Sequence, residues 1–421
     1  MKLAINSGIP LRDKKWPVWP VWDESADKLI HEVAQSGRWS VRGSWTGSEC
    51  MEQQAMRLFA EYNGCSYSVM TTSGSEALLL ALEAMDIGPG DEVIVPALTW
   101  IAPATSILNS GAVPVLTDIN PETTCIDTGA IKKAISRKTK AIMPVHLHCS
   151  IADMDEIMSI AREYGLFVIE DCSQAHGAVW DGKRVGTMGH AGVFSLNQEK
   201  VLTCGEGGVL ITNNPELYDR LFRIKTDGCA LDKDRKIPGD DQLIYDNRLM
   251  GSNYCASEFQ AAVLISQLKN LSSLNEIRRG NAKYLDEGLS RIPGLIPLKH
   301  HKKAEKCTYY EYAVKIDRRS FSNKELDKIC NALSCELGFS LHPTDVPIYR
   351  NKLFSPWTRK RYKYYVEDAR FKELSADKFP GCENTYDSLI VFHHSKLLSG
   401  RSDMDDIISA FEKVQMYSSE I

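Results

Sequence analysis

The sequence predicts an α/β protein in which a mainly parallel sheet is covered by helices on both faces and is joined to a smaller α+β region. Between residues 66 and 212, short apolar runs alternate with helical patterns. This alternation is typical of parallel strands connected by helical crossovers. After residue 300, predicted strands and helices follow one another without this regular alternation, as in an α+β unit. The 421 residues, of which 43% are hydrophobic, are enough for a sizeable core.

The first region contains seven candidate strands, each a short apolar run. They are Tyr67–Met70, Glu92–Pro96, Val113–Thr117, Ala141–Val145, Leu166–Glu170, Gly192–Leu196 and Val209–Thr212. Helical periodicity predicts helices at Glu76–Met85, Ala130–Ser136 and Asp153–Tyr164. Because ligands of parallel sheets bind at the carboxyl ends of strands, we look for a functional site just after these runs.

The rest of the chain is expected to complete this region and then form a smaller one. Residues 213–225 predict a helix, and the polar stretch from 227 to 249 predicts a long loop of the kind that is usually functional or mobile. Two helical patterns follow between Ser257 and Ile292. The later strands are expected at Tyr309–Ile316 and Leu389–Phe392, and the later helices at Asn323–Leu337 and Met404–Met416. We therefore expect an N-terminal arm (1–50), a large domain (51–265) and a small C-terminal domain (266–421).

Tryptophans distinguish the N-terminal arm from the rest of the chain. Five of the eight tryptophans lie in it, namely Trp16, Trp19, Trp22, Trp39 and Trp45. Buried aromatic side chains supply large contact areas at packing surfaces and interfaces. We expect these residues to anchor the arm on the main domain. The alternative is that one of them lines a subunit interface or a substrate pocket.

Composition argues against several classes of function. The net charge is −5 and there is no basic run, so a nucleic-acid partner is not expected. No run of about 18 apolar residues is present, so no membrane span is expected. The first residues lack the apolar core of a secretion signal, and a cytoplasmic location is expected. The run His146–Cys149 has no matching distal pair of metal ligands, and no GxGxxG opens a strand-to-helix turn, so neither a zinc site nor a dinucleotide-binding oxidoreductase is favoured.

A lysine and an aspartate indicate the chemistry. Asp171 comes directly after the fifth apolar run, and Lys200 follows the sixth, ahead of the glycine-rich turn Gly205–Gly208. The amine of such a lysine can form a Schiff base with the aldehyde of pyridoxal 5'-phosphate, while the carboxylate keeps the pyridine nitrogen protonated. Burial between strands would lower the pKa of Lys200 and make it a nucleophile and base. Taken singly, Asp171 is equally suited to capping a turn, and most lysines lie on the surface.

Other segments have the residue types that this cofactor needs. Ser73–Glu76 follows the first strand and opens a helix, where backbone N–H groups and the helix dipole can bind a phosphate. The same segment matches a capping box, so a plain helix cap is the alternative. Gln174 is placed to hydrogen-bond the ring hydroxyl. Trp100, just after the second strand, is placed either to stack on a planar ring or to join the core. Gly251–Tyr254 by itself is adequately described as a turn.

Together these motifs resemble the DegT/DnrJ/EryC1/StrS family of pyridoxal-phosphate-dependent aminotransferases, which act on keto sugars and keto cyclitols and have the type I, aspartate aminotransferase-like fold. The resemblance covers essentially the whole chain, from Trp39–Gly47 to Phe392–His394. It implies that Lys200 binds the cofactor aldehyde and moves the substrate proton, and that Asp171 pairs with the pyridine nitrogen. The other cofactor contacts that it implies are Ser73, Gly74, Ser75 and Ser195 at the phosphate, Gln174 at the ring hydroxyl, Trp100 on the ring, and Asn253 reaching across from a neighbouring subunit. The last contact implies a homodimer with shared active sites.

Within the family, the chain closely resembles the L-glutamine:scyllo-inosose and L-glutamine:2-deoxy-scyllo-inosose aminotransferases of aminocyclitol and antibiotic biosynthesis. The segments that carry this similarity are Trp16–Pro20, Thr99–Ala102, Gln198–Thr203, Gly251–Gln260 and Leu341–Thr358. Sugar 3-dehydratases of the superfamily have histidine in place of the lysine, so Lys200 favours transamination.

The implied function is ping-pong transamination, in which an amino group passes from L-glutamine or L-glutamate to the cofactor and then to a keto cyclitol. The alternative acceptor is a nucleotide-linked keto sugar of amino-sugar biosynthesis. A non-catalytic regulator or scaffold is disfavoured, because Lys200 and Asp171 are intact and no DNA-binding module is attached.

Overall fold

The structure is a computed structural model that describes residues 2–232, 234 and 237–421. The strands of its largest sheet are β1 (Tyr67–Thr71), β2 (Glu92–Pro96), β3 (Val113–Thr117), β4 (Thr139–Ile142), β5 (Phe167–Asp171), β8 (Ala191–Ser195) and β9 (Gly208–Thr212). They lie in the order β1-β9-β8-β5-β4-β2-β3. The five from β3 to β8 are parallel neighbours, and β9 is antiparallel to both β8 and β1. The seven predicted strands and the mainly parallel α/β sheet are therefore confirmed.

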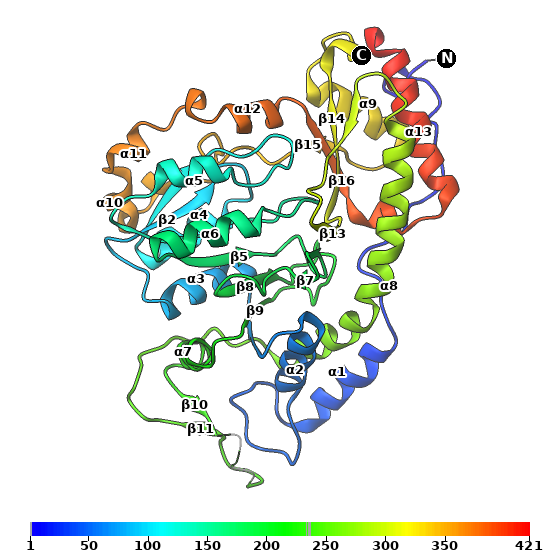
Figure 1. Cartoon of the computed structure of the whole chain (residues 1–421). Coiled ribbons are helices and arrows are strands. Elements are labelled where there is room, and N and C mark those ends of the chain that lie inside the picture. Colours follow the sequence, from blue (N-terminus) through cyan, green and yellow to red (C-terminus); the bar gives the residue numbers. More distant parts are fainter. Residues whose placement is uncertain (1, 233, 235–236) are drawn as a thin grey trace.

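Helices cover both faces of this sheet (Figure 1). One layer consists of α3 (Gly74–Ala84), α4 (Ala102–Ser110) and α7 (Pro215–Lys225). The other consists of α2 (Met51–Asn63), α5 (Thr128–Ala134), α6 (Met154–Tyr164) and the start of α8 (Glu258–Leu289). Successive strand residues alternate between the layers, since Val168 packs in the second core and Ile169 in the first. Both faces are apolar for this reason, which is why the strands are continuous apolar runs in the sequence.

The helix α8 runs without interruption for 32 residues, where the sequence analysis expected two helical patterns. It begins with a capping box made by Ser257 and Gln260. Its first half packs under the large sheet through Leu264, and its second half packs in the C-terminal core through Leu285. One helix therefore joins the two cores, and the boundary proposed between residues 265 and 266 lies within it.

The C-terminal part forms a second, antiparallel sheet in the order β12-β14-β16-β15. Its strands are β12 (Leu295–Pro297), β14 (Glu311–Ile316), β15 (His342–Pro343) and β16 (Leu389–His393). The helices α1 (Ser25–Ser36), α9 (Leu326–Leu337), α10 (Lys363–Val366), α11 (Ala369–Lys372), α12 (Pro380–Tyr386) and α13 (Arg401–Met416) complete the described helical structure outside the short 3-10 turns. A small third sheet contains β6 (Val179–Trp180), β7 (Lys183–Arg184) and β13 (Ala304–Lys306).

Trp16 and Trp19 attach the N-terminal arm to the body, as expected, whereas Trp22 and Trp39 are more than half exposed. The indole N–H of Trp16 donates to the carbonyl of Leu337 at 2.7 Å, and its ring lies edge-on against Phe339. Trp19 lies edge-on against His394, with ring centroids 4.6 Å apart. Both ends of the described chain meet beside α13 (Figure 1). The first part of the arm therefore packs on the C-terminal part of the chain, whereas α1 (Ser25–Ser36) packs on α8 beside α2, at the other end of the body (Figure 1).

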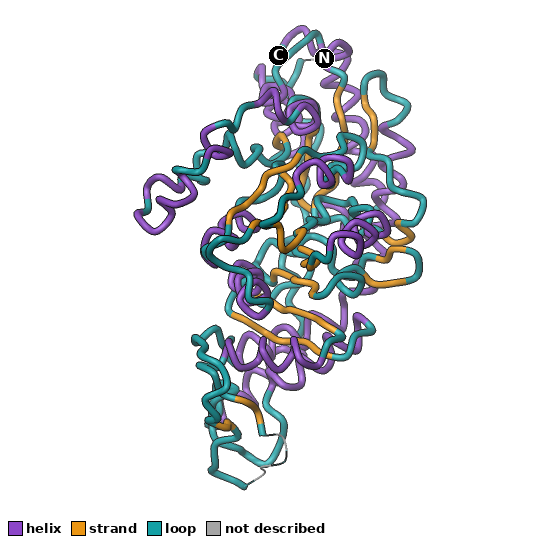
Figure 2. The backbone as a smooth tube through the Cα atoms, turned by 60° about the vertical axis from the view of Figure 1, so that its left-hand side comes forward, coloured by secondary structure: helices purple, strands orange, loops and turns teal. Residues whose placement is uncertain are grey.

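The polar segment 227–250 extends from the body beside α7 (Figure 1, Figure 2). Within it, β10 (Ala230–Leu231) pairs antiparallel with β11 (Leu243–Ile244). Residues 233, 235 and 236 of the predicted loop lie outside the described residues. Tyr245 and Met250 are 72% and 92% exposed, so this segment presents apolar side chains at its surface. In the described part of the chain, no helix is both long enough and apolar enough to cross a membrane.

Candidate active site

The residues singled out from the sequence converge on one cavity of about 380 Å³. It lies between the carboxyl ends of four strands of the large sheet, β1, β2, β5 and β8, and the edge of the C-terminal sheet. The predicted residues that line it are Ser73, Gly74, Ser75, Trp100, Asp171, Gln174, Ser195 and Lys200. This is the edge at which parallel sheets bind their ligands.

Lys200 follows β8, and its side chain points across the cavity to the C-terminal part of the chain. Its amine nitrogen lies 4.0 Å from the centroid of the Tyr310 ring. Burial lowers the pKa of Lys200, against the opposing effect of nearby carboxylates, of which Asp171 is the strongest. A lysine with a lowered pKa is more often unprotonated at neutral pH, so it can act as a nucleophile and as a base.

The turn that contains Lys200 is held by side chains from both ends of the chain. The indole N–H of Trp19 donates to the carbonyl of Gln198 at 2.9 Å. Nε2 of His393 and Nε2 of His394 lie 3.0 and 3.1 Å from the carbonyl oxygen of Glu199. The two peptide groups before the lysine are thus fixed from outside the large sheet, which positions the lysine backbone.

Asp171 is the last residue of β5 and is buried. Its Oδ1 accepts a hydrogen bond from the backbone N–H of Ser173 at 3.0 Å. Burial raises the pKa of Asp171, while the bonds from Ser173 and the charge of Lys200 oppose the rise. A buried carboxyl group of this kind is stabilised in its ionised form by a cation placed against it.

The start of α3 forms one wall of the cavity. The hydroxyl of Ser73 caps the helix by accepting from the N–H of Glu76 at 3.2 Å. The predicted capping box is only half formed, because within the described residues the Glu76 side chain accepts no bond from the backbone N–H of Ser73. Gly74 lies against Ser195, and a Cβ added at Gly74 would lie 2.7 Å from the Cβ of Ser195. Glycine thus allows the helix start and Ser195 to approach closely, with N–H groups and hydroxyls facing the same space.

Trp100 and Gln174 lie on other walls. Trp100 is 51% exposed, so it is not a core residue, and much of its ring remains accessible. Oε1 of Gln174 accepts from the backbone N–H of His148 at 2.5 Å. Because its oxygen is used in this way, the amide group of Gln174 has its two N–H donors left for a ligand.

Asn253 is the one predicted residue that does not line the cavity. It is exposed at the base of the 227–250 segment, where its backbone forms a bridge with Thr226. Its Oδ1 accepts from the backbone N–H of Cys255 at 3.1 Å. Its predicted role requires a neighbouring subunit and stays a prediction.

The C-terminal part contributes three cavity residues that were not predicted from the sequence. Tyr310 and Glu311 come from the start of β14, and Asp345 follows β15. None of them belongs to a motif with recognisable spacing. The signal available was only that Glu311 and Asp345 place carboxylates beside apolar strand runs, where an ionisable group needs a partner or a ligand.

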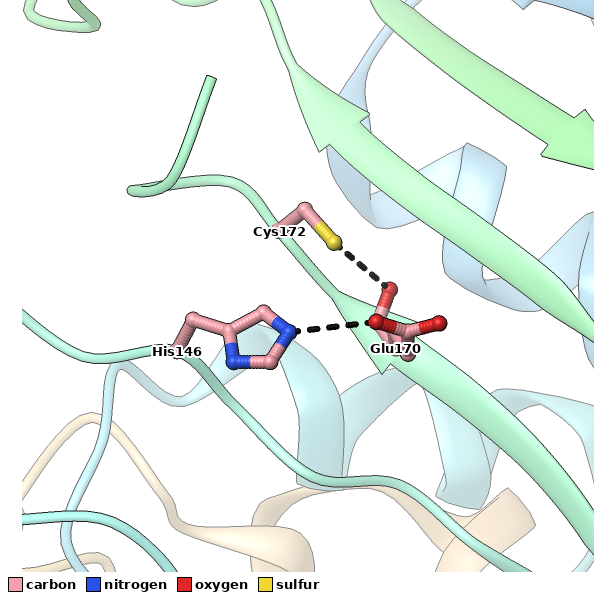
Figure 3. Close-up of side chains that lie close together, drawn as sticks. All are labelled: His146, Glu170 and Cys172. Carbon is pink, nitrogen blue, oxygen red and sulfur yellow. Dashed lines mark hydrogen bonds and ion pairs between the residues drawn. The ribbon is translucent and has the colours of Figure 1, made fainter. Parts of the chain in front are cut away.

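A buried cluster of His146, Glu170 and Cys172 has residue types that can bind a metal (Figure 3). Its polar atoms already have hydrogen-bond partners. Oε1 of Glu170 accepts from the backbone N–H groups of Met188 and Gly189, at 2.9 and 2.5 Å. Oε2 accepts from the N–H of Gly186 at 2.7 Å and lies 3.3 Å from Nε2 of His146.

His146 completes this arrangement. Its Nδ1 accepts from the backbone N–H of Ala152 at 3.1 Å, so its Nε2 carries the proton and donates to Glu170. The cluster is therefore a hydrogen-bonded support directly beneath Asp171, and its carboxylate fastens the turn 186–189 to the end of β5.

Comparisons with known proteins show which family the chain belongs to. The model of the DegT/DnrJ/EryC1/StrS aminotransferase family matches residues 21–409. The L-glutamine:2-deoxy-scyllo-inosose aminotransferase of Streptoalloteichus tenebrarius is 42% identical over 419 residues, which cover 100% of this chain and 99% of that protein. The L-glutamine:scyllo-inosose aminotransferase of Streptomyces griseus is 38% identical, covering 98% of this chain and 97% of that protein.

A solved structure shares the fold. The crystal structure of DesV from S. venezuelae, in complex with a ketimine intermediate, aligns with a TM-score of 0.77 and 28% identity, covering 94% of this chain and 95% of that one. The predicted fold and the family resemblance are both confirmed by these matches. The chain belongs to the DegT/DnrJ/EryC1/StrS aminotransferase family.

Proposed function

We propose that this aminotransferase uses pyridoxal 5'-phosphate to move an amino group from L-glutamine to a keto cyclitol of the scyllo-inosose or 2-deoxy-scyllo-inosose type. The observation that carries the proposal is that Lys200 and Asp171, from the ends of neighbouring strands, line the same cavity. The names of the relatives at 42% and 38% identity support L-glutamine as donor and an inosose as acceptor. L-glutamate is the alternative donor.

The residues of the cavity fit the cofactor. Ser73–Ser75 and Ser195 offer backbone N–H groups, hydroxyls and the positive end of α3 to its phosphate. Asp171, whose pKa is raised by burial, is suited to a protonated pyridine nitrogen. Gln174 has its amide N–H groups left for the ring hydroxyl, and Trp100 has an accessible ring to stack on the cofactor. When bound, the cofactor supplies an electron-withdrawing ring that makes the Cα proton of the amino donor acidic.

The protein's own residues then move the proton. The amine of Lys200 would move the proton from the Cα of the amino donor to the aldehyde carbon of the cofactor in the first half of the cycle, and would move a proton from that carbon to the acceptor carbon in the second half. Its lowered pKa favours the base form that this step requires. Asp171 stays ionised and holds the positive charge of the ring nitrogen in place. The packing of Lys200 over Tyr310 keeps the amine on one side of the cavity.

The charge of the cavity favours a neutral acceptor. Its acidic lining residues are Asp171, Glu199, Glu206, Glu311 and Asp345, whereas Lys200 is the one basic residue among the described lining residues. The pyrophosphate of a nucleotide-linked sugar would be repelled by this excess of carboxylates. A free polyhydroxy ketone carries no charge and can donate hydrogen bonds to them. A keto cyclitol is therefore favoured over the nucleotide-linked keto sugar.

A homodimer with shared active sites completes the proposal. Asn253 is exposed and lies beside the 227–250 segment, whose Tyr245 and Met250 are exposed apolar side chains. Exposed apolar side chains that gather in one place are typical of contact surfaces. We propose that Asn253 reaches the cofactor phosphate of the neighbouring subunit, and that the enzyme works in the cytoplasm.

A donor and acceptor panel tests the proposal. The purified enzyme should be yellow, borohydride should abolish this absorbance, and Lys200→Ala should lose activity. Free scyllo-inosose and 2-deoxy-scyllo-inosose should be aminated with L-glutamine, and nucleotide-linked keto sugars should not. Normal turnover by Lys200→Ala, or a preference for the nucleotide-linked acceptors, would contradict it.

A further inference from the structure

Two carboxylates on the C-terminal side of the cavity are not among the residues proposed to bind the cofactor. Glu311 is the first residue of β14, and Asp345 follows β15. Both line the cavity, and the negative charges of both act on Lys200. They therefore lie on the wall that faces the reacting amine, opposite the strand ends that carry Asp171.

Glu311 is held in a fixed orientation by His148. Nδ1 of His148 lies 2.7 Å from Oε2 of Glu311, and Nε2 of His148 lies 2.8 Å from the hydroxyl of Thr344. The backbone N–H of His148 donates to Gln174, which ties this unit to the proposed cofactor side of the cavity. Burial alone would raise the pKa of Glu311, but the hydrogen bond and charge of His148, followed by the charges of His342 and Lys200, lower it overall. Glu311 is thus an ionised, oriented acceptor.

Asp345 differs in having its carboxylate available. No hydrogen bond or ion pair joins it to another side chain in the described part of the chain. Burial and the charge of Glu311 raise its pKa, against the effects of His148 and Lys200. A half-buried carboxyl group that lines a cavity and has no protein donor is suited to a ligand that brings its own donors.

The two substrates of the reaction differ in what they offer to such a wall. Ring hydroxyls donate hydrogen bonds, which carboxylates accept strongly. The α-carboxylate of an amino-acid donor has no hydrogen to offer and would be repelled. Contacts with Glu311 and Asp345 are therefore available to the acceptor ring and not to the carboxylate of the donor.

We propose that Glu311 and Asp345 bind the hydroxyl groups of the acceptor ring and so determine the preference for a polyhydroxylated ketone. His148 is a positioning residue that orients Glu311. This inference rests on the proposed function, since it assigns the residues that recognise the acceptor named there.

The test separates the two half-reactions. Asp345→Ala, Asp345→Asn and Glu311→Gln are compared with wild type, and Asp387→Asn, which changes an exposed carboxylate after α12, serves as the control. The donor half-reaction is followed in a single turnover with L-glutamine, through the loss of yellow absorbance. The acceptor half-reaction is followed with scyllo-inosose, and binding of unreactive scyllo-inositol to the pyridoxamine form is measured by calorimetry.

We expect Asp345→Ala to raise the KM for scyllo-inosose at least about tenfold and to weaken scyllo-inositol binding equally, as for a lost hydrogen bond to a charged group. The donor half-reaction should stay within about twofold of wild type, and Asp345→Asn should recover part of the loss. An unchanged KM for the ketone, or an equal loss in both half-reactions, would overturn the inference while the proposed function stands. A wild-type enzyme that neither binds scyllo-inositol nor aminates an inosose would overturn both.

Discussion

Replacing Glu170 by glutamine tests how the end of β5 is supported. Glu170 accepts hydrogen bonds from three backbone N–H groups and from His146, two donors on each oxygen. A glutamine of the same shape has only one oxygen, so its amide N–H₂ would face two donors instead of accepting from them. Each buried donor left unpaired costs about 1–3 kcal/mol. Because two donors are affected and the turn can partly relax, we expect the free energy of unfolding to fall by about 2–4 kcal/mol.

Thermal unfolding and hydrogen exchange measure this loss. For a unit of about 150–250 residues, 1 kcal/mol corresponds to a shift of about 2–4 °C in Tm, so Glu170→Gln should lower the first unfolding midpoint by at least about 4 °C. The amides of Gly186, Met188 and Gly189 should exchange faster than in wild type. Glu305→Gln, which changes an exposed glutamate, should alter neither measurement. A midpoint within about 1 °C of wild type, with unchanged exchange of these amides, would refute the reasoning.

Three further predictions concern the cavity and its supports. Asp171→Asn should lower turnover by about 10²–10³, because it removes the charge that stabilises the protonated ring, with Tm measured in parallel to show that the fold persists. Trp19→Phe keeps the aromatic contact with His394 but loses the hydrogen bond to the Lys200 turn, so cofactor retention in dialysis should weaken about fivefold, while Trp22→Phe, at an exposed position, should not change it. Burial lowers the pKa of His176 from 6.5 to about 3, so the folded state keeps it neutral while the unfolded chain takes up a proton below about pH 6.5. Stability should therefore fall as the pH drops from about 6.5 towards 3, and His176→Asn should flatten this dependence in urea titrations followed at each pH.

The large sheet was predictable because its strands are buried on both faces. Val168 and Ile169 pack in different cores, so successive positions of the run Leu166–Ile169 are apolar, and the run stands out from the amphipathic helices around it. The placing of Lys200 and Asp171 in the cavity could be predicted because Asp171 lies at the end of such a run and Lys200 lies a few residues after another. Each of the two residues can be recognised from its neighbours in the sequence, although the proposed reaction requires both of them in one cavity.

The rest depends on contacts between distant segments. The single helix α8 resembles two in the sequence because its apolar face changes where it passes from one core to the other. Asn275 and Arg278 are buried in this part of the helix, and their polarity resembles a break. Glu311 and Asp345 were missed because they become neighbours only when β14 and β15 are both placed in the C-terminal sheet, through pairing with β16.

Trp19, His393 and His394 hold the Lys200 turn by hydrogen bonds. These contacts affect the order in which the parts of the protein fold. A chain leaving the ribosome can form its parallel sheet, and place Asp171, well before the last 30 or so residues are made. The lysine turn acquires its full set of contacts only after β16 has emerged and the N-terminal arm has docked. We therefore expect the chain to become able to retain the cofactor only late in its synthesis. Chains released before their C-terminal part is made would lack a working site.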